Sequence, residues 1–200
     1  MMEKGNQLVP VSRLVDVTVM EFQTREFVGK VADLIVVPTR GVSVGIIIKP
    51  NKKSEYSLSW NNIFLQGDTV FVHGEYSEPE YFPPTSGIIK ASGELVGASI
   101  VTEEGKLIGH VRDVIFEPET MNLIYKFSAP GWRSVLRNEY FLAGNFPYAY
   151  SLFRNRLFVP SDSVIHTSAE ATLRGGRQCE RGLILAGQPG KLVPQGNRQQ

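Results

Sequence analysis

The sequence predicts an all-β protein made of two small β-barrels in tandem, followed by a disordered C-terminal tail. Three observations lead to this prediction: an internal repeat, short strands with alternating side chains, and turn residues between those strands. The composition allows a packed core, because 42% of the 200 residues are hydrophobic and 10% are aromatic. The expected parts are a first repeat (11–73), a linker (74–90), a second repeat (91–167) with an insertion (131–156), and a tail (168–200).

The internal repeat is clearest in a Gly-x-Val-x-Asp pattern that recurs after 80 residues. Upstream of this pattern, residues 14–19 match residues 95–100 at an offset of 81, and downstream residues 57–63 match residues 158–164 at an offset of 101. The larger downstream offset predicts that the second copy carries the insertion. The motif residues expected to have a structural role are Gly29, Val31, Asp33, Gly109, Val111 and Asp113.

Each copy has the residue pattern of short β-strands. Residues 31–37 alternate between two faces, residues 42–48 are rich in β-branched side chains, and residues 68–73 follow a Gly-Asp turn. Gly105 lies in a hairpin turn, where a positive φ is readily accepted. Because closely spaced strands with short turns are typical of small barrels, we expect each copy to close and leave no free edge.

The two segments outside the repeats differ from them in composition. Three prolines predict a stiff, extended linker, whereas six glycines and two prolines predict that the tail from Ser168 onward is disordered. Charge is also uneven: the net charge is −5 over 1–125, +3 over 126–167 and +3 over 168–200. The chain as a whole is +1, so it has no overall basic field of the kind that binds nucleic acid.

The repeated module resembles the PRC-barrel, a small β-barrel domain. The resemblance rests on the Gly-x-Val-x-Asp motif, on the apolar strands 44–48 and 123–127, and on a short segment at 58–63 that is echoed at 159–164. In this alignment Ser161 takes the place of Trp60. Membership of this family implies a protein that presents its surfaces to partners and has no shared catalytic site.

The resemblance therefore predicts a non-catalytic adaptor or assembly protein that binds protein partners and needs no cofactor. Two alternatives follow from other members of the family. One is a peripheral, cytoplasmic-side subunit of a membrane complex, by similarity to the H subunit of photosynthetic reaction centres. The other is an RNA- or ribosome-associated factor, by similarity to a ribosome-maturation factor. A cytoplasmic location is expected, since the N-terminal residues lack an apolar leader and no apolar run approaches about 18 residues.

No pattern of catalytic or metal-binding residues stands out. The repeat-related Asp33 and Asp113 each belong to their own barrel, so nothing in the spacing brings them into one cleft. Each is expected to accept backbone N–H groups at a turn or barrel rim. Three histidines at 73, 110 and 166 are too scattered for a metal-ligand motif. Cys179 has no second cysteine to pair with and is expected to be a free thiol. We therefore expect neither an enzyme nor a metal site.

The insertion is the best candidate for a partner surface. It contains seven of the twenty aromatic residues of the chain together with four arginines, a combination enriched in protein interfaces. Three other interpretations stay open: burial as a satellite core, contact with a membrane surface, or stacking on single-stranded nucleic acid. The candidate partner-binding residues are Trp132, Arg133, Arg137, Tyr140, Phe146, Tyr148, Tyr150, Phe153, Arg154 and Arg156.

Overall fold

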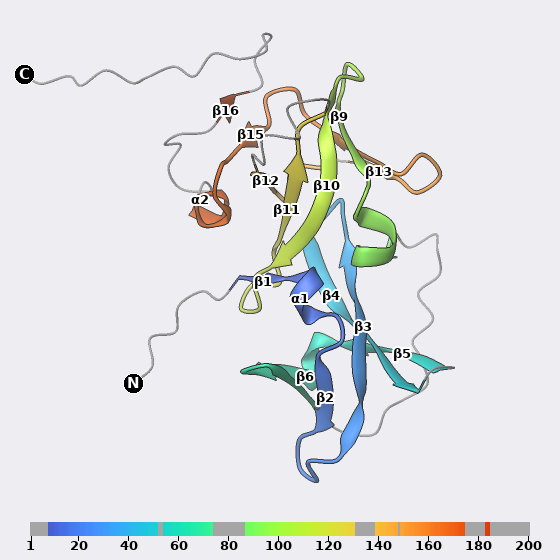
Figure 1. Ribbon diagram of the computed structural model, residues 1–200. Helices are drawn as coiled ribbons and strands as arrows, with labels where there is room; N and C mark the ends of the chain where they lie inside the picture. Colours follow the sequence, from blue (N-terminus) through green and yellow to red (C-terminus); the bar gives the residue numbers. More distant parts are fainter. Residues whose placement is uncertain are drawn as a thin grey trace, which may run out of the picture.

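The computed structural model describes residues 8–51, 54–73, 87–130, 139–147, 149–174 and 183–184. Two seven-stranded sheets account for most of them. Figure 1 shows one sheet above the other, with the short helix α1 (Val11–Leu14) between them.

The first sheet holds six strands of the first repeat in the order β5-β4-β3-β2-β7-β6. Neighbours are antiparallel except β2 and β7, which run parallel. A 3-10 turn, η1 (Trp60–Asn62), separates β5 from β6. The strands are β2 (Thr18–Glu21), β3 (Phe27–Val37), β4 (Val42–Asn51), β5 (Ser54–Ser59), β6 (Ile63–Gln66) and β7 (Thr69–Val72).

The second sheet repeats this order strand for strand, as β12-β11-β10-β9-β14-β13. Its one parallel pair, β9 with β14, corresponds to β2 with β7. The structure thus shows two copies of one module. The strands are β9 (Ser99–Thr102), β10 (Leu107–Phe116), β11 (Leu123–Ser128), β12 (Glu139–Ala143), β13 (Ala149–Ser151) and β14 (Arg156–Val159).

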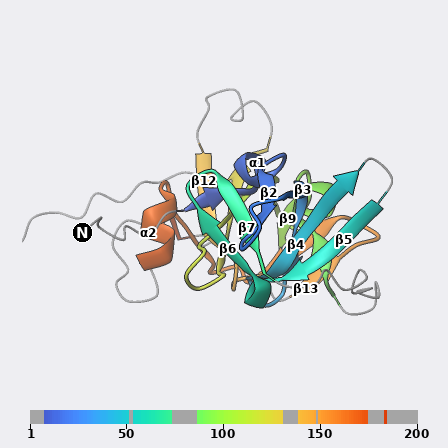
Figure 2. The same ribbon diagram turned by 90° about the horizontal axis from the view of Figure 1, so that it is seen from below.

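Both sheets are barrel-like, which confirms the predicted fold class, but neither is closed. Figure 2 shows from below how the strands of the first sheet curve around one another. Among the described residues, no ladder joins the outer strands β5 and β6, or β12 and β13. The prediction of closed barrels is therefore wrong. The spacing of turns indicates how many strands there are, but not whether the two outer strands of a sheet form hydrogen bonds with each other.

The interpretation of 131–156 as an insertion is wrong for its described residues. β12 pairs with β11 as β5 pairs with β4, and β13 pairs with β14 as β6 pairs with β7, so both strands belong to the repeated module. The sequence alignment of 58–63 with 159–164 paired segments that are not equivalent. Trp60 follows β5, whereas Ser161 follows β14, which corresponds to β7. The second copy has a longer connection between β11 and β12, at 129–138, of which residues 131–138 lie outside the described residues.

Part of the expected disordered tail belongs to the fold. Helix α2 (Ala169–Arg174) begins inside it, and Ala169 packs with Ile115, Ile124 and Phe141 on the outer face of the second sheet. Strand β16 (Leu183–Ile184) pairs with β15 (Val164–Ile165). Residues 175–182 and 185–200, which include Cys179, lie outside the described residues, as does most of the linker, 74–86.

One hydrophobic core serves both repeats. Fully buried side chains from the first sheet, such as Leu34 and Ile46, belong to the same cluster as Tyr125 and Leu157 from the second. Two short segments cross between the sheets: β1 (Val9–Pro10) pairs with β10, and β8 (Ile89–Lys90) pairs with β3. The helix α1 follows β1, and a π-helical turn, η3 (Ala91–Leu95), follows β8. The two repeats are therefore interlocked rather than two independent domains.

Candidate docking site

The motif aspartates have partners in the opposite repeat. Asp33, which is buried, accepts the backbone N–H groups of Ser92 (2.8 Å) and Gly93 (3.1 Å). Asp113 accepts the N–H of Ser12 (3.3 Å) and its hydroxyl. The expected role as acceptors of backbone N–H groups is present, and the structure adds that each aspartate also binds the opposite repeat.

The other motif residues are explained by packing. A Cβ on Gly29 would lie 2.6 Å from the carbonyl oxygen of Lys49, and one on Gly109 would lie 2.2 Å from that of Ser128. Since real Cβ atoms do not approach so closely, glycine allows the neighbouring strand to pass. Val31 and Val111 are buried in the shared core.

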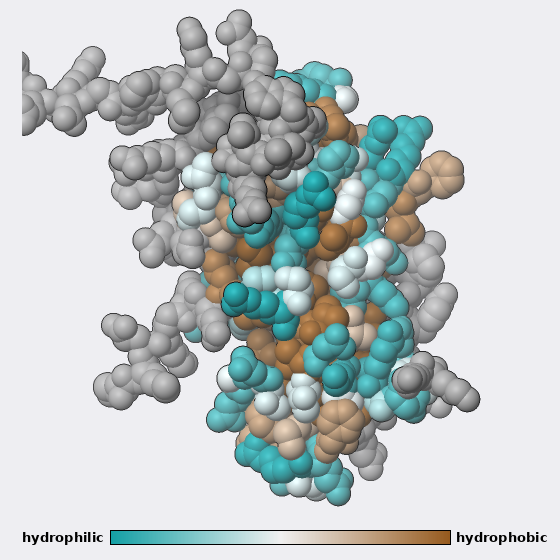
Figure 3. Space-filling model, viewed as in Figure 1, coloured by the Kyte–Doolittle hydropathy of each residue, from teal (hydrophilic) through white to brown (hydrophobic). Residues whose placement is uncertain are grey.

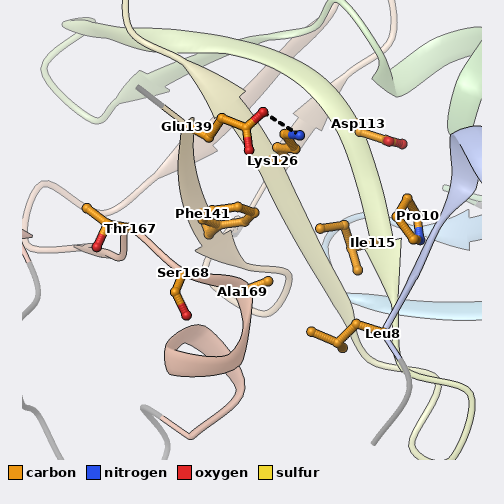
Figure 4. Close-up of a pocket in the computed structure, with 10 residues that line it drawn as sticks. All are labelled: Leu8, Pro10, Asp113, Ile115, Lys126, Glu139, Phe141, Thr167, Ser168 and Ala169. Carbon is orange, nitrogen blue, oxygen red and sulfur yellow. Dashed lines mark ion pairs between the residues drawn. The ribbon is translucent and has the colours of Figure 1, made fainter. Parts of the chain in front are cut away.

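A groove of about 400 Å³ lies on the outer face of the second sheet, between the N-terminal segment and the start of α2. Figure 4 shows Phe141 near its centre, with the ion pair between Lys126 and Glu139 (2.6 Å) above it. Each charged group in the groove is already engaged, because Asp113 is held by Ser12. The full lining is Leu8, Pro10, Asp113, Ile115, Lys126, Glu139, Phe141, Thr167, Ser168 and Ala169.

The histidines do not come together, and the described residues contain no group of three side chains that could hold a metal ion. His73 lies against Phe22, with ring centroids 4.4 Å apart. The Nδ1 atom of His110 is 3.3 Å from the hydroxyl of Ser99. His166 is buried, and desolvation lowers its pKa.

The structure divides the aromatic and arginine candidates into three groups. Tyr140, Phe146 and Tyr150 are half-buried and pack against the main core, as the burial interpretation expects. Phe153, Arg154 and Arg156 are exposed. The remaining candidates, Trp132, Arg133, Arg137 and Tyr148, lie outside the described residues.

The exposed candidates cluster at the connection between β13 and β14, which we call the β13–β14 tip (residues 152–155). Phe153 is 98% exposed, and its neighbour Leu152 is 51% exposed. Figure 1 shows this connection as an orange loop that projects from the side of the second sheet, and Figure 3 shows hydrophobic atoms at the end of the projection. Leu152 and Phe153 are adjacent, so together they form a small exposed apolar patch at the tip.

Hydrogen bonds at its base fix the tip in place. The hydroxyl of Tyr150 donates to one of two acceptors, the carbonyl oxygen of Glu94 (3.0 Å) or the side-chain oxygen of Asn155 (3.1 Å). Asn155 has a φ of 46°, in the left-handed region that asparagine tolerates, and its carbonyl accepts the N–H of Ser99 at 3.0 Å. Burial and the nearby carboxylate of Glu94 raise the pKa of Tyr150 to about 12, so its hydroxyl keeps its proton at neutral pH.

The charge around the tip is positive. Arg154 and Arg156 are exposed, and neither forms an ion pair with a carboxylate in the part of the chain that the structure describes. Both guanidinium groups are thus available to a partner. Sequence reasoning included Phe153 and the two arginines but missed Leu152, whose exposure depends on its place in the turn.

Comparison with known proteins relates the second repeat to a known domain family. Residues 89–142, from β8 to β12, match the family model of the PRC-barrel domain. The match lies in the second repeat, and the evidence that the first repeat shares its fold is the common strand order. No curated protein matches the chain. Within the described residues, no helix is both long and apolar enough to cross a membrane.

Proposed function

From the premise that the second repeat of this protein is a PRC-barrel domain, we propose that the chain is a non-catalytic adaptor or assembly protein. It binds a protein partner through the β13–β14 tip. The observation that carries the proposal is the 98% exposure of Phe153, which lies beside the exposed Leu152 and is followed by two exposed arginines, Arg154 and Arg156, that have no ion-pair partner among the described residues.

The first repeat provides an internal comparison. Its equivalent turn, between β6 and β7, consists of Gly67 and Asp68, both exposed. A turn of two such residues is enough to join these strands, so the fold does not require the longer, apolar turn of the second repeat. The extra length, the aromatic ring and the two arginines are therefore features of the second repeat alone, which supports a role in binding.

The chemistry of the tip suits a protein interface. Burying a phenylalanine or leucine side chain contributes about 1.5–3 kcal/mol, and arginine is enriched among the residues that dominate binding energy. Because Tyr150 and Asn155 already order the turn, little conformational entropy is lost on binding. A rigid apolar tip with two adjacent cations fits a pocket whose rim carries carboxylates.

The test is site-specific photo-crosslinking of the full chain in its native lysate. The photoreactive residue p-benzoylphenylalanine replaces Phe153 in one protein and Phe27 in the control, since Phe27 is a 62% exposed phenylalanine in the first repeat. We expect a discrete crosslinked product from position 153 only. Excess wild-type protein should prevent formation of this crosslinked product by competition. The double substitution Arg154→Ala and Arg156→Ala should reduce its yield severalfold.

Three results would contradict the proposal. Equal crosslinking from both positions would show that exposure alone explains capture. Binding of the wild-type chain to vesicles of anionic lipid, lost on Phe153→Ser but not on Phe27→Ser, would favour the alternative of a peripheral subunit at a membrane. Crosslinks to RNA at position 153 would favour the ribosome-associated alternative.

A further inference from the structure

The two repeats exchange their N-terminal segments. In β1, Val9 and Pro10 pair with the end of β10, at Phe116 and Ile115. In β8, Ile89 and Lys90 pair with the end of β3, at Val36 and Ile35. The two pairings join equivalent positions, because each residue of the second repeat lies 80 positions after its counterpart. We call residues 9–14 and 89–95 the exchange segments.

Each exchange segment is fastened by the motif aspartate of the other repeat. Asp113 holds Ser12, and Asp33 holds Ser92 and Gly93. Each carboxylate also accepts the N–H of the residue that follows it, at 2.8 Å for Asp33 and 2.9 Å for Asp113, which fixes its orientation. Hydrogen bonds to an ionised carboxylate are stronger than neutral ones, so each aspartate is a strong link between repeats.

The exchange segments also fill the shared core. Val11 and Leu14 in the first segment and Ala91 and Leu95 in the second are at most 3% exposed. All four belong to the cluster that combines side chains of both sheets. On the surface, Lys90 of the second segment forms an ion pair with Glu55 of the first repeat at 2.7 Å. Removing either repeat would therefore expose apolar surface on the other.

We infer that the interface between the repeats is a self-complementary docking surface whose partner is another copy of the same repeat. The chain is thus a covalently joined, segment-exchanged dimer. Neither repeat holds its sheet by itself, and the linker is not needed to keep the two together. This inference is independent of the β13–β14 tip and of any external partner.

The first test cuts the linker in the folded protein. A protease recognition sequence replaces residues 78–82 of the full chain, and the folded protein is cleaved and passed over a size-exclusion column. We expect both fragments to elute together at the volume of the uncut chain, to unfold in one thermal transition, and to separate only in denaturant. Fragments that elute separately, each with the circular dichroism of folded strands, would overturn the inference.

The second test uses the intact chain, so that it does not depend on cleavage. Hydrogen exchange is measured for Asp33→Asn and Asp113→Asn. Because each carboxylate holds a segment of the opposite repeat, each single change should lower amide protection in both sheets, by about tenfold or more. The control is Glu139→Gln, which breaks an ion pair with Lys126 inside the second sheet and should leave protection in the first sheet unchanged. Loss of protection confined to one sheet would refute the interlocked arrangement.

Discussion

Trp60 of the first repeat stacks on Phe116 of the second, with ring centroids 5.3 Å apart and planes inclined by 24°. Phe116 is fully buried, and the indole Nε1 of Trp60 donates to the Ser43 hydroxyl at 2.8 Å. This contact joins the two sheets directly through aromatic packing.

The first prediction concerns this contact. Phe116→Ala should lower the free energy of unfolding by about 3–5 kcal/mol, since it leaves a cavity at the junction of the repeats. Phe153→Ala, which removes the same atoms from an exposed ring, should leave it within about 0.5 kcal/mol of wild type. Urea denaturation of both variants measures the difference, and a loss below about 1 kcal/mol for Phe116→Ala would contradict the packing described.

A second prediction compares two glycines with similar backbones. Gly41 has a φ of 64° and Gly67 a φ of 59°, so an alanine is strained at either position. At Gly41 a Cβ would also lie 2.2 Å from the backbone carbon of Gly144, whereas at Gly67 it would meet nothing within 4 Å. Gly67→Ala should cost about 1 kcal/mol, and Gly41→Ala should cost clearly more. Equal melting temperatures for the two variants would show that the repeats do not touch at Gly41.

The third prediction is a pH dependence that arises at His166. Its ring is buried, and its Nδ1 atom has no hydrogen-bond partner among the described residues, so desolvation lowers its pKa. The unfolded chain therefore binds a proton more readily than the folded one. The contribution of neutral His166 to the free energy of unfolding is complete above the ordinary histidine pKa of about 6.5. It is lost as the pH falls through the lowered pKa of His166 in the folded chain.

Urea denaturation between pH 7.5 and 5.5 measures this effect. His166→Gln should show a smaller decrease in stability over that range than wild type. An unchanged slope in His166→Gln would assign the pH dependence to other groups.

The fourth prediction concerns the anchoring of the β13–β14 tip. Tyr150→Phe keeps the ring in the core but removes the hydroxyl that donates to the carbonyl oxygen of Glu94 or to the side-chain oxygen of Asn155. Hydrogen exchange at residues 152–156 should become faster, and crosslinking from position 153 should fall, while the melting temperature changes by only a few degrees. Unchanged exchange at the tip would show that Asn155 alone holds the turn.

Much of the fold could be predicted because the repeat has strong local signals. The Gly-x-Val-x-Asp pattern lies on a strand where glycine lets a neighbour pass, valine faces the core and aspartate binds backbone N–H groups. Each requirement restricts the type of residue at one position, so each can be recognised in the sequence. The strand that contains Asp33 and the one that contains Asp113 were therefore found together.

Other parts could not be predicted, since they depend on contacts between distant residues. The pattern shows that Leu14 and Leu95 are apolar, but not that both lie in a core shared by the two sheets. The match of residues 58–63 to 159–164 failed because a six-residue pattern of common residue types can fit by chance, and only strand pairing shows that β12 follows β11. The burial of Ala169 depends on an apolar patch on the outer face of the second sheet, which the tail sequence does not reveal.

The exchange of segments also constrains how the chain folds during synthesis. Val9 and Pro10 leave the ribosome early, yet the strand with which they pair ends at Phe116. The first sheet likewise lacks β8 until residue 90 has emerged. A nascent chain that stops within the linker therefore exposes the apolar ends of β3 and α1, and it becomes native only after most of the second repeat has been translated.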